Sequence, residues 1–378
     1  MSGLLAGLLL SASLASGPPA PIPAIEPVAL GAALHRAADS LQSRVSASGR
    51  FLYRLDAEGR LRPGYNAVRH AGTLWALQAL QARQPDPERA AALARASQYL
   101  EHCCLRPLPA FPAAWAVWSD DEGEPAEAKL GAAGLALAAW QGLRAQGLPA
   151  PAPERLQGLA RFLVYQQKPN GHFHAKFRNG RRDDRWVSLY YPGEAALGLL
   201  AQHRADGDPR WREAAGAALL ALADQRQRSG RYLADHWALI ASQALAEQAA
   251  AGLPDPLQAH LEATVAVILE EGARHGDDFG RGGRTAPIAT RLEGLLAALP
   301  LLAPDGALAQ ASRAQLGRSL PLLLGAARRH PPLLGAIPRA LPGSTDPRAA
   351  ELRIDDTQHV LSVLLGLCRL QKYACTRP

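Results

Sequence analysis

Residues 65–80 read YNAVRHAGTLWALQAL, a polar cluster that leads into an apolar run. Asn66, Arg69 and His70 form the cluster, and small and bulky apolar side chains continue as far as Leu80. A helix that begins polar and then becomes apolar on most of its sides is usually buried, with only its N-terminus reaching water or a ligand. The same design recurs five more times along the chain, and these six polar helix starts guide the prediction of the fold.

Apolar periodicity and helix start and stop signals predict twelve helical segments. They run over about residues 30–46, 65–81, 86–102, 127–144, 153–167, 191–203, 208–226, 235–248, 255–274, 287–299, 305–329 and 355–372. The connections after every second segment are short, whereas most of the others are longer and richer in Gly, Pro and charge. Three longer connections, at 48–51, 170–173 and 229–232, share a small polar residue, a Gly, a polar residue and an aromatic. This phrase predicts a recurrent turn that sends a ring inward.

A repeated helical hairpin with its long loops on one side indicates a repeat architecture. Six hairpins that close on themselves form a toroid with six parallel inner helices and six outer ones. An open superhelical solenoid is the alternative, but its inner helices would not converge on a centre. Long alternating runs rich in Val, Ile and Thr are missing, which argues against a β-rich fold. We therefore expect an all-α (α/α)6 toroid of six helical hairpins.

The composition of the 378 residues fits a globular chain with a large core, because 48% are hydrophobic and 20% are charged. The formal net charge of +7 fits either an arginine-rich solvated surface or attraction to an acidic substrate or surface. No basic tract with interleaved aromatics is present, so we expect no nucleic-acid partner. No later stretch offers about 18 uninterrupted apolar residues, so no membrane span is expected. The sequence makes no prediction of the oligomeric state.

The first residues predict export. An apolar run from Leu4 to Leu14 leads to a small-x-small cleavage site that ends at Ala15, although no Lys or Arg precedes the run. We therefore expect a periplasmic or secreted protein. Its parts would be a signal peptide at 1–16, a Pro-rich linker at 17–29 and the toroid domain at 30–375.

In a toroid, all six inner helices point their N-termini at the same mouth, beside the long loops, and each adds a partial positive charge there. Arg69, Lys129 and Arg291 lie in predicted first turns, where a cation opposes that charge. Each is expected to face an anionic ligand or a carboxylate of another inner helix. For Arg69 and Arg291 the predicted partners are Glu194, Glu293 or Asp355.

The candidate site combines these charged residues with histidines and aromatics at the same helix starts. His70, His236 and His359 occupy matching first-turn positions, although each alone fits a structural histidine as well. Asp235 has the simpler alternative of a helix N-cap. The candidates for acid–base catalysis are Glu194, Asp235, His236, Glu293, Asp355, His359 and His70. The candidates for binding substrate are Asn66, Arg69, Lys129, Trp186, Tyr190, Arg291 and Gln358.

No metal and no cofactor are predicted. HExxH and CxxC patterns are missing, the histidines lack regular metal-ligand spacing, and no cysteine occupies an inner-helix start. The four cysteines, Cys103, Cys104, Cys368 and Cys375, do not form a disulfide scaffold. In an exported chain one bridge would be consistent with them, and none is required.

Four phrases, YNAVRHAGTLWAL, AKLGAAGLAL, YYPGEAALGLL and DHWALIASQAL, resemble inner-helix motifs of six-hairpin (α/α)6 toroid proteins. This group includes glycoside hydrolases, uronate lyases, uronyl C5-epimerases and N-acylglucosamine 2-epimerase-like proteins. The resemblance covers about residues 30–372 and implies a carbohydrate-active enzyme that uses general acid–base catalysis on a polar or acidic saccharide. By resemblance to the 2-epimerase-like group, His236 and His359 would be acid and base. The C5-epimerases rely on Tyr and carboxylate groups, and by resemblance to them Tyr190 and Glu194 would be the candidates.

The alternative is a non-catalytic toroid that binds a saccharide or a protein, because one fold hosts many functions. Geometry distinguishes the two. A catalytic site should place two titratable groups about 5 to 10 Å apart across an open cleft, whereas a binding module would show stacking aromatics without such a pair.

Overall fold

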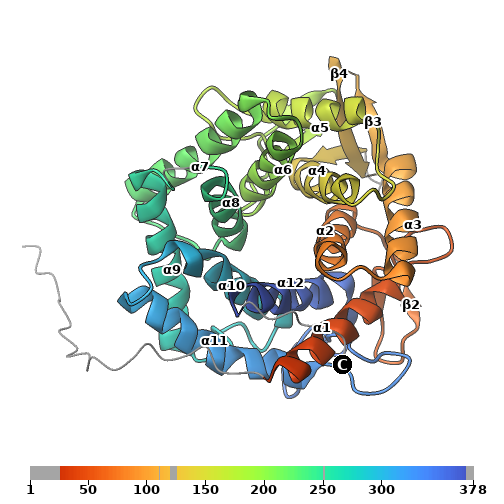
Figure 1. Ribbon diagram of the computed structural model, residues 1–378, viewed down its shortest axis with the longest axis vertical. Helices are drawn as coiled ribbons and strands as arrows, with labels where there is room; N and C mark the ends of the chain where they lie inside the picture. The colour runs from red at the N-terminus through yellow and green to blue at the C-terminus, as the bar shows by residue number, and fades with distance from the viewer. Residues whose placement is uncertain (1–25, 110, 120–125, 250–251, 372–378) are drawn as a thin grey trace, which may run out of the picture.

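The computed structural model describes residues 26–109, 111–119, 126–249 and 252–371. Twelve α-helices of these residues form two concentric rings (Figure 1). The inner ring contains α2 (Ala67–Arg83), α4 (Leu130–Ala145), α6 (Tyr191–Asp206), α8 (His236–Ala246), α10 (Thr285–Ala298) and α12 (Ile354–Leu370). The outer ring contains α1 (Pro27–Gln42), α3 (Pro87–Cys104), α5 (Pro153–Gln166), α7 (Pro209–Ser229), α9 (Asp255–His275) and α11 (Ala307–Ala326). A short 3-10 helix, η1 (Leu299–Leu301), follows α10.

The ring is closed. Helix α12 packs on α10 and α2, and α1 packs on α12 and α2, so the last hairpin meets the first. The predicted (α/α)6 toroid is therefore confirmed, and the open solenoid is excluded. The predicted signal peptide at 1–16, most of the linker, and the predicted ends of the last helix and the domain lie outside the described residues. Among the residues described, no helix has the length and apolarity needed to cross a membrane.

Local sequence signals explain where the helices begin. The side chains of Asn66, Asp86, Asp208 and Asp235 each accept a hydrogen bond from a backbone N–H in the first turn of the helix that follows. Proline stands in the first turn of α1, α3, α5, α6, α7 and α9, where its missing N–H costs nothing. The four-residue phrase shared by three long loops forms a turn, as predicted. Gly49 has φ 87°, and a Cβ at that position would collide with the carbonyl oxygen of Arg95.

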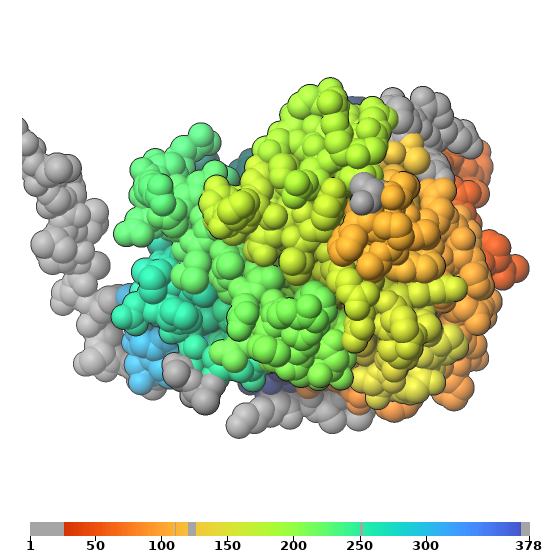
Figure 2. All heavy atoms as spheres, turned by 90° about the horizontal axis from the view of Figure 1, so that it is seen from above, coloured from red at the N-terminus to blue at the C-terminus, as the bar shows by residue number. Residues whose placement is uncertain are grey.

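Two small antiparallel sheets are built from the long loops, and the sequence did not predict them. One has the order β3-β4-β5-β6-β7, with strands Leu105–Leu108, Phe111–Ser119, Glu127–Lys129, Lys176–Arg178 and Arg181–Asp183. The other has the order β2-β1-β8, with strands Leu61–Arg62, Arg54–Leu55 and Leu352–Arg353. Figure 2 views the ring from its edge, where the yellow-green segment that includes β6 and β7 rises above the neighbouring helices.

These sheets correct one predicted helix. Residues 127–129 were expected to begin an inner helix, but they form β5, which pairs with β4 and β6. The backbone of Lys129 therefore lies in a strand and only caps α4, and its ammonium lies 3.3 Å from the Glu127 carboxylate. Lys129 is not a first-turn cation.

Candidate active site at the mouth of the toroid

A cavity of about 270 Å³ opens where the inner helices begin. Five of the predicted site residues line it: Arg69, Tyr190, His236, Asp355 and His359. The rest of the wall comes from Trp237, Arg284, Ala286, Pro287, Thr290, Arg339, Arg353 and Asp356. Polar side chains thus converge on the mouth from α2, α8 and α12 and from the loops that enter them.

Two histidines face each other in this cavity. His236 is the first residue of α8 and His359 lies on α12, and their ring centroids are 5.5 Å apart with planes inclined by 75°. Nδ1 of His359 donates a hydrogen bond of 2.8 Å to Oε2 of Glu293, and Nε2 of His236 lies 3.8 Å from the same oxygen. All three residues are buried. The Glu293 carboxylate fixes the orientation of the His359 ring, as a carboxylate partner commonly does for a working histidine.

His236 differs from His359 in that neither of its ring nitrogens has a hydrogen-bond partner within the described structure. Burial lowers the pKa of His236 well below its ordinary value, and the nearby charges of His359, Arg291 and Arg69 lower it further. The imidazole is therefore neutral, with a nitrogen free to accept a proton. Tyr190 packs edge-on against it at 4.9 Å between ring centroids.

The charged wall of the cavity is built around Asp355. Its carboxylate is bonded to Arg353 and lies 3.3 Å from Nε of Arg69. Burial would raise the pKa of Asp355, but Arg69 and Arg353 outweigh burial and the pKa is lowered. Burial and the charge of Asp355 raise the pKa of the adjacent Asp356 to about 8. At neutral pH one anion thus stands among several guanidinium groups.

The two predicted arginine pairings have different outcomes. Arg69 pairs with Asp355 of the inner helix α12, as predicted. The prediction for Arg291 is wrong, because its Nε lies 2.6 Å from Glu271 of the outer helix α9. Helix α10 begins at Thr285 rather than at residue 287, which places Arg291 a full turn past its start, where a cation is no longer opposed to the dipole.

Several candidate residues serve the fold instead of lining the cavity. Asp235 is fully buried, caps α8 and forms an ion pair of 2.6 Å with Arg226, which is the simpler alternative recognised in the sequence. Asn66 caps α2 through the N–H of Arg69. His70 has both nitrogens bonded away from the mouth, to Tyr65 and to the carbonyl of Ala96.

The remaining candidates lie around the cavity. Glu194 is buried between α4 and α6, and burial raises its pKa to about 8. Gln358 is also buried and donates to Ser362 at 3.3 Å. Trp186 is 47% exposed on the loop before α6 and packs against Tyr191. Glu293 touches the mouth only through the two histidines.

Sequence reasoning missed Arg284, Arg339, Arg353, Asp356 and Trp237 as cavity residues. Arg353 and Asp356 belong to the RIDD phrase at the start of α12, so their position next to Asp355 was a usable signal. Arg284 and Arg339 carried no such signal in the sequence. They reach the mouth from loops whose paths depend on tertiary contacts, such as the β-bridge between Arg284 and Ala340.

His236, Glu293 and His359 are also the one set of three side chains, among the described residues, whose donor atoms lie close enough to share a metal ion, within 4.8 Å of one another. Two imidazoles and a carboxylate suit a first-row transition metal by donor type. The surroundings fit a cation poorly, because Arg69 and Arg291 already act on His236 as positive neighbours. Residues far apart in sequence supply these donors, so spacing did not predict them.

The sequence matches no protein-family model, and it matches no curated protein. Solved structures do resemble it. A cellobiose 2-epimerase from Spirochaeta thermophila aligns over 90% of this chain and 96% of its own, with a TM-score of 0.67 and 14% identity.

An unsaturated glucuronyl hydrolase specific for heparin aligns over 92% of this chain and 99% of its own, with a TM-score of 0.64 and 13% identity. A D-mannose isomerase aligns over 90% and 97%, with a TM-score of 0.62 and 12% identity. The chain therefore has the (α/α)6 toroid fold that these glycoside hydrolase-like and epimerase-like proteins share.

Proposed function

We propose that this protein is a carbohydrate-active enzyme that moves a proton at the carbon next to a sugar carbonyl, as in 2-epimerisation or aldose–ketose isomerisation. The observation that carries the proposal is the pair of imidazoles, His236 and His359, 5.5 Å apart in the mouth cavity. This separation falls within the range expected for two groups acting on one substrate. The structural neighbours include an epimerase and an isomerase of sugars, which supports the same class of reaction.

The two histidines have complementary roles in this reaction. The neutral His236 accepts the proton from the carbon, and the electron pair of the broken C–H bond forms an enediolate with the carbonyl. His359, whose ring is oriented by its hydrogen bond to Glu293, delivers a proton to the intermediate from its own side. The guanidinium of Arg69, which lines the same cavity, stabilises the negative charge on the enediolate oxygen. The reverse reaction uses the same groups in the opposite order, so the two histidines exchange roles.

Hydrolysis is less well supported because two of the carboxylates near the mouth already have arginine partners. Asp235 is paired with Arg226, and Asp355 with Arg353 and Arg69. A glycoside hydrolase would need two carboxyl groups placed on either side of the scissile bond. We assign proton transfer to the histidine pair ahead of Asp356, whose carboxylate lies 3.6 Å from Nε of Arg353.

The substrate we propose is an acidic sugar. Four arginines line the mouth, Arg69, Arg284, Arg339 and Arg353, against Asp355 and Asp356. Burial and Asp355 raise the pKa of Asp356 to about 8, so its carboxyl group is mostly protonated at neutral pH. The four arginines of the lining then face one charged carboxylate, that of Asp355. A carboxylate or other acidic group on the sugar would offset this excess.

The test is solvent exchange. Incubating the protein in D2O with a panel of aldoses, ketoses and uronic acids should replace the hydrogen at the carbon next to the carbonyl, which proton NMR detects. His236→Asn and His359→Asn should each lower the rate by about 10²-fold or more, whereas His275→Asn, at an exposed position in the last turn of α9, should not. Treatment with EDTA should leave the rate unchanged, because imidazoles rather than a metal transfer the proton.

Three results would overturn the proposal. The first is full activity in folded His236→Asn and His359→Asn variants. The second is release of reducing ends or of an unsaturated product without exchange, which would indicate a hydrolase or a lyase. The third is saturable sugar binding without turnover, which would indicate a binding toroid.

A further inference from the structure

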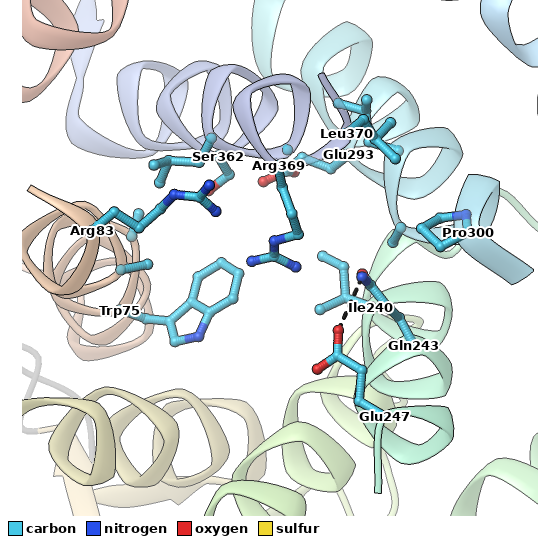
Figure 3. A pocket seen from close by; sticks show the side chains of 16 residues that line it. Trp75, Arg83, Ile240, Gln243, Glu247, Glu293, Pro300, Ser362, Arg369 and Leu370 are labelled. Carbon is cyan, nitrogen blue, oxygen red and sulfur yellow. Dashed lines mark hydrogen bonds between the residues drawn. The ribbon is translucent and has the colours of Figure 1, made fainter. Parts of the chain in front are cut away.

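A second cavity, of about 420 Å³, lies at the opposite end of the ring, among the C-terminal halves of α2, α8, α10 and α12 (Figure 3). It is separated from the mouth by two contacts. Trp75, which lines this rear cavity, packs against Trp237 of the mouth with ring centroids 5.3 Å apart. Glu293, which also lines it, is bonded to His359 of the mouth. The rear cavity is therefore a separate space from the proposed active site.

The walls of the rear cavity are mainly apolar. Trp75, Ile240, Leu296 and Leu365 contribute large side chains from four different inner helices. Trp75 and Ile240 are only partly buried, so part of their surface faces the cavity. A flat apolar body is the kind of ligand that such a wall would accommodate, because pockets recognise ligands by apolar surface with a few converging polar groups.

Two arginines stand at the open end. Arg83 and Arg369 are exposed in the last turns of α2 and α12, and Figure 3 shows both side chains reaching into the space beside Trp75. Within the part of the chain that the structure describes, neither guanidinium has an ion pair or a side-chain hydrogen bond. Burial and the charge of Arg369 lower the pKa of Arg83. The adjacent Glu247 is held instead by Arg204 at 3.3 Å.

Glu293 offers an unsatisfied acceptor at the closed end. Oε2 of Glu293 is engaged by His359, but its Oε1 is buried and has no hydrogen-bond partner among the described residues. Leaving a charged acceptor buried and unsatisfied is costly. Trp75 and Arg83 are eight residues apart on one helix, a rise of about 12 Å along its axis, and the arginine side chain extends back over part of that distance.

We propose that the rear cavity binds a small hydroxyaryl carboxylic acid or a molecule of the same design. The acid group would bind Arg83 and Arg369, the ring would lie against Trp75, and the hydroxyl would donate to Oε1 of Glu293. The apolar wall, the two cations that have no ion pair among the described residues and the unsatisfied oxygen of Glu293 together define this ligand class. The site is a separate cavity from the proposed active site and shares Glu293 with it.

The proposal is tested by calorimetric titration with 4-hydroxycinnamate as the probe. We expect saturable binding with a Kd below about 1 mM. The double variant Arg83→Gln/Arg369→Gln should weaken it by about tenfold or more, because charge-assisted hydrogen bonds are lost. Cinnamate, which lacks the hydroxyl, should bind several-fold more weakly. Arg144→Gln is the matched control, since Arg144 is exposed in the last turn of the inner helix α4 but does not line the cavity.

All three positions are exposed, so the variants should unfold at the same temperature as the unmodified protein. No saturable binding, or equal affinity in the double variant, would overturn the proposal. Equal binding of cinnamate would overturn the assignment of Glu293 as the acceptor for the hydroxyl. None of these results depends on whether the protein acts on a sugar.

Discussion

His70 lies between the rings of Phe51 and Tyr99, with both of its nitrogens engaged. Because a carbonyl oxygen can only accept, Nε2 carries the proton that is donated to Ala96, and Nδ1 accepts from the Tyr65 hydroxyl. A neutral ring satisfies both bonds with the Tyr65 hydroxyl as a donor, and its burial disfavours the charged form. Position in a first turn suggested a proton carrier, but the side chain points away from the mouth and ties α2 to α3.

This arrangement predicts a pH dependence of stability. Burial lowers the pKa of His70 to about 3 in the folded protein, whereas the unfolded chain retains a value of about 6.5. Between these values only the unfolded state binds the proton, so the contribution to the free energy of unfolding is fully present above about pH 6.5. It is lost as the pH falls, by at most about 1.4 kcal/mol per pH unit.

Urea unfolding of the unmodified protein and of His70→Gln, at pH values from about 4.5 to 7.5, checks this dependence. The variant should be less stable at neutral pH and should show a shallower loss of stability on acidification. His275→Gln, at an exposed position, serves as the control and should follow the unmodified protein. Parallel curves for the unmodified protein and His70→Gln would mean that His70 titrates normally in the folded state.

At the scale of helices, the sequence predicted the number, type and approximate bounds of the segments because apolar periodicity and caps are local signals. It failed at residues 127–129, where a run of helix-forming residues pairs as the strand β5. Strand pairing with β4 and β6 depends on segments elsewhere in the chain, so no local pattern reveals it. The same holds for Glu271, the partner of Arg291, which comes from a neighbouring hairpin.

Helices α4 and α6 approach closely through glycines, and this contact can be tested. A Cβ at Gly198 of α6 would lie 2.5 Å from the carbonyl oxygen of Gly134 on α4, and backbone cannot move aside easily. Gly198→Ala should therefore lower the free energy of unfolding by about 1–3 kcal/mol through overpacking. Gly216→Ala in α7 is the matched control, since nothing lies within 4 Å of its Cβ.

The control should gain about 0.5–1 kcal/mol, because alanine favours a helix more than glycine does. Chemical denaturation of the two variants measures both the expected loss of stability in Gly198→Ala and the expected gain in Gly216→Ala. Equal changes in the free energy of unfolding of the two variants would mean that the backbones of α4 and α6 are not in direct contact at Gly198.

At the scale of the whole molecule, ring closure brings together what the sequence keeps apart. His236, Glu293 and His359 come from three hairpins and meet because their helices surround the centre of one ring. The sequence could place each of them on an inner helix, but not at a given depth. Because α10 begins earlier than predicted, Glu293 lies further along its helix, away from the mouth. Its side chain therefore stands between the mouth and the rear cavity instead of facing solvent.

The charge of the whole molecule makes a last prediction, which rests on the proposed acidic substrate. A net charge of +7 and four arginines around the mouth should attract an anionic sugar from a distance. The Debye length falls from about 30 Å at 0.01 M salt to about 3 Å at 1 M. The KM for a uronic acid should therefore rise several-fold over this range, whereas the KM for a neutral sugar should not change.

Arg284 is the residue on which this attraction can be tested separately. It is exposed at the rim of the mouth, and among the described residues no carboxylate pairs with its guanidinium, which contacts only the carbonyl of Arg281. Arg284→Gln should raise the KM for the acidic sugar by about threefold to tenfold at low salt with little change in kcat, because a contact made equally with substrate and transition state is lost. Arg144→Gln, at the other end of the ring, removes the same charge from the molecule and should have a much smaller effect. If the two variants behave alike, or if the acidic and neutral sugars respond alike to salt, the mouth does not select an anionic substrate.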